Sequence, residues 1–142
     1  RAQEVLSTII PGIHLLFIKE RDLELLWGRG GDAEEELRRL KGEFGIANIV
    51  LTQGRKGASA LLGDQFESHA AFDGEAVSPI GAGDALAAGV LYSLMEGEQE
   101  LALKRGCAMA SLARESRGDY VIGGKLALDA RMQGEVSRGL CR

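Results

Sequence analysis

The sequence predicts a mixed α/β fold in which strands and helices form a single layered unit. Apolar runs of strand length alternate with helical stretches in the first half of the chain, and the second half is mostly helical. The first two strand-like runs are separated by a stretch long enough for a parallel crossover connection. With 142 residues the chain can bury a sizeable core, and no internal repeat, low-complexity segment or linker divides it.

Four segments have the composition of strands. Two are continuous apolar runs, typical of strands buried on both faces: IHLLFI at 13–18 and IANIVLTQ at 46–53. The next two, ASALL and QFESHA, are separated by Gly63-Asp64, a pair that favours a tight turn. We therefore expect these two segments to form a β-hairpin.

Helices are expected between and after these strands, each with a recognisable start or stop. Asp32 is placed to cap the helix AEEELRRLKGEFG, in which Leu37, Leu40 and Phe44 share one face that should be buried. The other predicted helices are residues 1–10, closed by Pro11-Gly12; LELLWG, stopped by Gly28; residues 84–97; residues 98–116; and a last helix from about Lys125.

Composition excludes several classes of protein. The net charge of −4 argues against a nucleic-acid or anionic-membrane surface, and no apolar run is long enough to span a membrane. Cys107 and Cys141 lack metal-ligand spacing, so we expect two reduced thiols. The chain starts at Arg1 with no signal peptide, which favours the cytoplasm. The missing initiator Met indicates a fragment or a trimmed chain.

The stretch SPIGAGDALAAGV, residues 78–90, places small residues before an apolar helix. Gly81, Ala82 and Gly83 would leave backbone N–H groups accessible at the positive end of the helix dipole, which suits a phosphate or an oxyanion. Asp84 follows in the first turn, where a carboxylate beside an anion is costly and so suggests a proton acceptor. A tight turn with a dipole-complementing Asp remains the alternative.

A second polar motif follows the strand at 46–53. In LTQGRKG, Thr52 and Gly54 lie at the carboxyl end of that strand and Gly57 comes next. Ligands of open α/β sheets bind at this edge, and a hydroxyl with glycine amides suits nucleotide phosphates. A plain strand-to-hairpin turn is the alternative. The chain has neither the Gly-Lys-Ser/Thr of a P-loop nor a third glycine that would complete a dinucleotide fingerprint.

Together and in this order, the two motifs resemble those of the ribokinase, or PfkB, family of sugar kinases. The residues that satisfy its second signature are Ser78, Pro79, Ile80, Gly81, Ala82, Gly83, Asp84, Ala88 and Gly89. The likeness covers nearly all of the chain, including a Gly118-Asp119 turn similar to that of 2-keto-3-deoxygluconate kinases. The resemblance implies a ribokinase-like three-layer α/β/α (Rossmann-like) unit.

The resemblance also implies roles for individual residues. Gly81, Ala82 and Gly83 would form the anion hole for the transferring γ-phosphoryl group, and Asp84 would be the catalytic base. Mg²⁺ would arrive with ATP, and the substrate would be a sugar or sugar acid, in a full-length protein that is a possible homodimer. The nucleotide contacts would come from Thr52, Gly54, Gly57 and the stretch from Cys107 to Ser111, which would border the adenine.

Three departures from the family pattern bear on activity. The usual Asn-x-x-Glu after the first strand is replaced by Lys19 and Asp22, which leaves Asp22 as the candidate ligand in the metal's water shell. Ser78-Pro79 replaces an Asp-Thr pair, which weakens any monovalent-cation site, and Cys107 stands where Asn is common.

Length is the largest departure, because the sugar-binding residues and the lid lie in the N-terminal half of family members. Residues 1–142 are therefore expected to be the C-terminal, nucleotide-binding and catalytic portion of a sugar kinase. The alternative is a degenerate, non-catalytic nucleotide-binding module or an inactive fragment.

Overall fold

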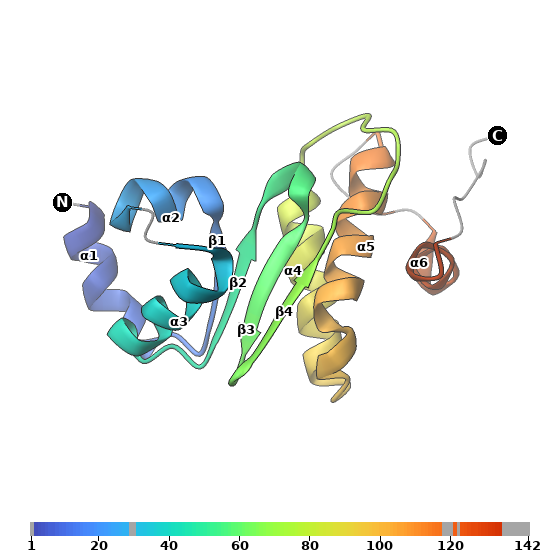
Figure 1. Cartoon of the computed structure of the whole chain (residues 1–142). Helices are drawn as coiled ribbons and strands as arrows, with labels where there is room; N and C mark the ends of the chain where they lie inside the picture. The colour runs from blue at the N-terminus through green and yellow to red at the C-terminus, as the bar shows by residue number, and fades with distance from the viewer. Residues whose placement is uncertain (1, 29–30, 118–120, 122, 135–142) are drawn as a thin grey trace. The chain divides into compact units, whose positions relative to one another are not determined.

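A computed structural model of the chain describes residues 2–28, 31–117, 121 and 123–134. The chain forms two compact units, residues 1–68 and 69–142 (Figure 1). The sequence predicted a single unit, and the boundary between the two falls at the end of the last strand. No shift in composition marks this boundary in the sequence. Strand β4 leads directly into an irregular segment that lacks the composition of a linker.

The first unit carries a four-stranded sheet with the order β1-β2-β3-β4. Strands β1 and β2 are parallel, whereas β2 and β3 are antiparallel, so the predicted parallel pairing of the first two strands is confirmed. The hairpin of β3 and β4 also forms as predicted. The elements are α1 (Ala2–Ile9), η1 (Ile10–Gly12), β1 (Leu15–Lys19), α2 (Glu20–Trp27), α3 (Ala33–Phe44), β2 (Asn48–Thr52), η2 (Gly54–Lys56), β3 (Ala58–Leu62) and β4 (Gln65–His69).

Burial differs between the two parallel strands. Ile49, Val50 and Leu51 of β2 are buried, as a strand covered on both faces should be. The apolar residues of β1 are only half-buried, so the expectation of full burial was wrong for this strand. The reason is its place at one edge of the described sheet, where only β2 flanks it.

Helix α3 supplies much of the core of this unit. Leu37, Leu40 and Phe44 pack in one cluster with strand residues such as Ile49 and Leu61. The helix begins with a capping box, in which the Asp32 carboxylate accepts a hydrogen bond from Glu35 N at 3.0 Å and the Glu35 side chain accepts one from Asp32 N. The predicted cap and the predicted buried face are therefore both confirmed.

Helix α2 begins at Glu20, three residues earlier than expected. The charged residues after β1 are its first turn, where Glu20 and Asp22 lie at the positive end of the helix dipole. Gly28 ends the helix with φ 74°, as predicted. The change in start matters because it places a carboxylate immediately after β1.

The second unit is helical: α4 (Ala82–Met95), η3 (Gln99–Leu101), α5 (Ala102–Glu115) and α6 (Gly124–Met132). Helices α4 and α5 lie side by side (Figure 1), in contact at Gly89 and Gly106. A Cβ at Gly89 would lie 2.8 Å from Arg105 O and from Gly106 Cα, so only glycine permits this approach. Ala108, Leu112 and Leu128 join α5 to α6.

Two sequence expectations lie outside the described residues, namely the Gly118-Asp119 turn and the thiol of Cys141. Cys107 is a free, buried cysteine, as predicted. Across the described parts of the chain, none of the helices is long and apolar enough to cross a membrane.

Candidate active site

The predicted anion hole is the N-terminus of α4. Helix α4 begins at Ala82, two residues earlier than expected, with Gly81 as the N-cap in the left-handed region at φ 81°. The first intrahelical hydrogen bond runs from Ala85 N to Gly81 O at 2.9 Å. The amides of Ala82, Gly83 and Asp84 therefore precede the helical hydrogen-bond ladder and point away from the helix.

Gly83 has no structural reason in the described chain to be glycine. Its φ is not positive, it is exposed, and a Cβ built there would meet nothing within 4 Å. Glycine in a helix costs about 0.5–1 kcal/mol relative to alanine. The missing side chain instead leaves open space beside backbone donors, which is what an approaching anion requires.

Asp84 is exposed in the first turn of α4. Its carboxylate has no hydrogen-bond or ion-pair partner within the described chain. The carboxylate thus stands beside the open amides of the same turn and is accessible to a substrate. No hydrogen bond of the Asp84 side chain within the described residues supports a role as a helix cap.

A second group of predicted residues lies at the carboxyl edge of the sheet in the first unit. The register places Lys19 of β1 opposite Thr52 of β2, so the two parallel strands end together. After Thr52 the chain turns through η2: Gln53 N donates to Gly57 O at 2.9 Å and Gly57 N donates to Gly54 O at 3.2 Å. The amide of Gly57 is thus used within the turn.

The glycines of this turn are needed for its conformation. Gly54 has φ 60°, and Gly57 has φ 110° with ψ −132°, a combination that side chains rarely tolerate. A contribution of Gly57 to nucleotide binding would therefore come from the shape of the turn.

Sequence reasoning missed Glu20. Its carboxylate accepts hydrogen bonds from Gln53 Nε2 at 3.1 Å and from Lys56 Nζ at 3.1 Å, which ties the start of α2 to the turn after β2. Gln53 in turn accepts a hydrogen bond from Ser59 Oγ at 2.9 Å. The available signal was its position two residues after a predicted strand, 13–18. Asp22, the residue selected by motif spacing, is exposed.

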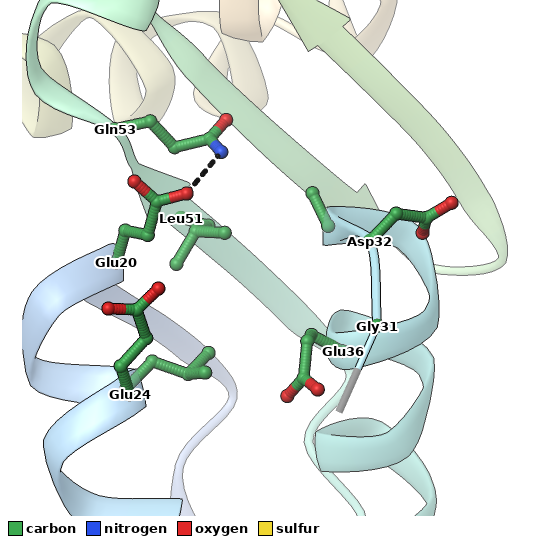
Figure 2. A pocket seen from close by; sticks show the side chains of 9 residues that line it. Glu20, Glu24, Gly31, Asp32, Glu36, Leu51 and Gln53 are labelled. Atoms are coloured by element: carbon green, nitrogen blue, oxygen red, sulfur yellow. Dashed lines mark hydrogen bonds between the residues drawn. The ribbon is translucent and has the colours of Figure 1, made fainter. Parts of the chain in front are cut away.

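A small acidic pocket of about 30 Å³ lies beside this edge. Figure 2 shows Glu20 and Glu24 on one wall and Asp32 and Glu36 on the other, with the Glu20–Gln53 hydrogen bond at its rim. Glu36 is buried and forms an ion pair with Arg39 at 2.7 Å. Among the residues that the structure describes, no three His, Cys, Asp or Glu side chains are placed to hold a metal together.

The predicted adenine-border residues lie on α5 in the second unit. Both side chains are buried: Cys107 Sγ lies 3.9 Å from His69 O, and Ser111 Oγ accepts a hydrogen bond from Arg131. Burial raises the pKa of the Cys107 thiol to about 11. Neither side chain presents an exposed polar group to a ligand.

The predicted residues thus form two local groups. Gly81, Ala82, Gly83 and Asp84 share the start of α4, and Thr52 with the η2 turn shares the edge of the sheet. The first group belongs to one compact unit and the second to the other.

Comparison with known proteins assigns the chain to a family. A model of the pfkB family carbohydrate kinases matches residues 1–122. A 2-dehydro-3-deoxygalactonokinase from Haloferax volcanii is 33% identical over 122 residues, which cover 85% of this chain and 38% of that protein. The chain therefore spans about two fifths of that relative's length.

Solved structures of kinases share the fold. Ribokinase from Thermotoga maritima matches 89% of this chain and 44% of its own with a TM-score of 0.76 and 22% identity. Fructokinase from Vibrio cholerae O395 matches 92% of this chain and 44% of its own with a TM-score of 0.77 and 24% identity. The matched residues include the first turn of α4, and the chain belongs to the pfkB family of carbohydrate kinases.

Proposed function

We propose that the protein transfers the γ-phosphoryl group of ATP to a hydroxyl group of a sugar or sugar acid. This chain would act as the C-terminal portion that carries the nucleotide contacts, the anion hole and the catalytic base. The observation that carries the proposal is the first turn of α4, where three features coincide: amides without a side-chain cap, a glycine to which the described chain gives no structural role, and an exposed carboxylate.

The relatives support the substrate class. The Haloferax relative is named for a sugar acid, 2-dehydro-3-deoxygalactonate, and the Vibrio fructokinase was solved with fructose, ADP and a calcium ion. Family membership itself supports a carbohydrate acceptor and a kinase reaction.

In the proposed reaction, Asp84 accepts the proton of the acceptor hydroxyl as its oxygen attacks the γ-phosphorus and the bond to the ADP leaving oxygen breaks. The amides of Ala82, Gly83 and Asp84 donate hydrogen bonds to the oxygens on which negative charge accumulates. The bound nucleotide would supply the phosphoryl group, and Mg²⁺ bound with it would neutralise charge on the phosphates.

The residues of the first unit would hold the nucleotide. The Thr52 hydroxyl lies at the carboxyl end of β2. At Gly54, in the η2 turn, no side chain covers the backbone, and a Cβ built there would meet nothing within 4 Å. Asp22 is exposed and able to reach a metal through water, while Glu20 fixes the turn itself. We propose that Mg²⁺ is held chiefly by the nucleotide.

The test compares Asp84→Asn with Glu34→Gln in the intact protein. Both remove one carboxylate from the first turn of a helix, but Glu34 is paired with Arg38 on α3. Asp84→Asn should lower kcat about 10²–10⁴-fold and leave ATP affinity nearly unchanged. Glu34→Gln should leave kcat unchanged.

The readouts are coupled phosphoryl transfer to a panel of sugars and sugar acids, and nucleotide binding by calorimetry. Near-native turnover of Asp84→Asn would refute its role as the base. ATP binding by the wild-type protein with no transfer to any acceptor would instead favour the degenerate binding module.

A further inference from the structure

A buried arginine joins three parts of the second unit. The side chain of Arg131, on α6, is 3% exposed. Its guanidinium donates two hydrogen bonds of 2.7 Å to the Glu115 carboxylate, one to Ser111 Oγ and one of 3.1 Å to the carbonyl oxygen of Asp73. Arg131 therefore connects α6, the C-terminal part of α5 and the irregular segment that precedes α4.

Burying a charged arginine and its carboxylate partner carries a large desolvation penalty for attaching a helix. A buried ion pair repays its desolvation only with good geometry and satisfied hydrogen bonds, and apolar side chains of similar volume pack equally well. Arg131 Nε has no partner in the described chain, and Nη1 is shared by three acceptors. The contact that apolar packing cannot replace is the hydrogen bond to the Asp73 carbonyl.

The segment that Arg131 holds has few other attachments. Residues 73–77 are exposed and have no regular secondary structure. At its start Phe72 packs in the core, with its ring stacked 4.9 Å from that of His69. At its end Val77 N and Ser78 N both donate to Arg114 O, at 2.8 and 3.0 Å.

Both ends of the segment 73–78 are attached to the last turn of α5, one through Arg131 and the other directly. Glu115, which orients Arg131, is the neighbour of Arg114, whose carbonyl holds Val77 and Ser78. Gly74 is fitted against the same pair, because a Cβ there would overlap the Glu115 carboxylate and lie 3.1 Å from Arg131 Nη1. The backbone then continues from Ser78 to Gly81, the N-cap of α4. A hydrogen bond from Ile80 N to the Ser78 hydroxyl stabilises this short stretch.

We propose that Arg131 is a positioning residue for phosphoryl transfer. Acting through Glu115 and the Asp73 carbonyl, it fixes the segment 73–80, and with it the orientation of Gly81 and of the open amides that follow. This role rests on the proposed function of the α4 N-terminus. It requires Arg131 to touch neither substrate nor nucleotide.

The kinetic test compares Arg131→Met with Arg105→Met in the intact protein. Arg105 is a matched control, because it is a buried arginine of the same unit that bonds a serine, Ser93, and a glutamate, Glu98, but not the segment before α4. Arg131→Met should lower kcat about 10- to 100-fold with the KM for ATP nearly unchanged, as expected of misplaced catalytic groups.

Arg105→Met should lower the melting temperature but keep kcat within about twofold of wild type. Arg131→Lys keeps the charge and can donate to Asp73, so it should recover part of the lost kcat. Equal loss of kcat in the two methionine variants, or no loss in Arg131→Met, would overturn the proposal.

An exchange measurement separates this proposal from the proposed function. Arg131→Met and Gly74→Ala should both speed amide hydrogen exchange at Val77 and Ser78 by about tenfold or more, whereas Arg105→Met should not. Gly74→Ala leaves the arginine in place, so it covers the case in which Arg131→Met does not fold. Unchanged exchange would overturn the proposal even in an active kinase. An inactive wild-type protein with the expected exchange pattern would refute the kinase reaction but uphold the anchoring of the segment.

Discussion

Replacing Gly83 by alanine separates the needs of the fold from those of the proposed anion hole. The residue is exposed, lies within α4 with ordinary helical φ, and has room for a Cβ, since nothing lies within 4 Å. Alanine should therefore stabilise the helix, by about 0.5 kcal/mol or somewhat more. For a chain of this size, that corresponds to a rise in melting temperature of about 1–3 °C.

The effect on activity should have the opposite sign. The new methyl group would stand where a phosphoryl oxygen must approach the backbone, and loss of one oxyanion donor typically costs about 10²–10³-fold in kcat. Gly42→Ala is the matched control: Gly42 is also an exposed glycine inside a helix, α3, with nothing within 4 Å of a built Cβ. It should stabilise the protein similarly and leave kcat unchanged.

Thermal unfolding and steady-state kinetics on the same three proteins test both halves of this reasoning. A Gly83→Ala protein that is more stable and fully active would refute the close approach of an anion at this residue. A protein that loses both stability and activity would refute the claim that the fold has no need of this glycine.

Two further outcomes follow from packing and burial. Gly89→Ala should destabilise the protein by about 1–3 kcal/mol in denaturant unfolding, because its Cβ would lie 2.8 Å from backbone atoms of α5; unchanged stability would mean that α4 and α5 are not in contact there. Burial raises the pKa of the Cys107 thiol to about 11, so the reactive thiolate is scarce at pH 7 and increases only as the pH rises toward 11. Iodoacetamide labelling of Cys107, followed by mass spectrometry, should be slow at pH 7–8, and rapid labelling there would contradict this environment.

Sequence reasoning succeeded where one short stretch contains both halves of an interaction. Asp32 and Glu35 are three residues apart and form the predicted capping box, and Gly63-Asp64 closes the predicted hairpin. The motif from Ser78 to Gly89 is equally local, and it led to the family that the comparison confirms. In each case the physical cause lies within a few residues along the chain.

The features that were missed depend on distant parts of the chain. Glu20 meets Lys56, 36 residues further on, and motif spacing alone pointed to Asp22 instead. The half-burial of β1 depends on which strands flank it, which an apolar run does not encode. The nucleotide roles of Thr52, Gly54 and Gly57, the cytoplasmic location and the homodimer remain predictions.

Helices α3 and α4 begin in opposite ways, and the contrast bears on function. At α3 the chain satisfies the first amides with its own side chains, through the reciprocal hydrogen bonds of Asp32 and Glu35. At α4 the N-cap is Gly81, which has no side chain to offer, and Gly83 adds a cost in helix stability. Helices α2, α5 and α6 also lack a side-chain cap, but only at α4 do the uncapped amides lie beside Gly83 and beside Asp84, whose carboxylate has no partner in the described structure. An acidic residue in the first turn is favourable for the helix itself, but folding gives no reason for Gly83, whereas an anionic group that must approach the backbone does.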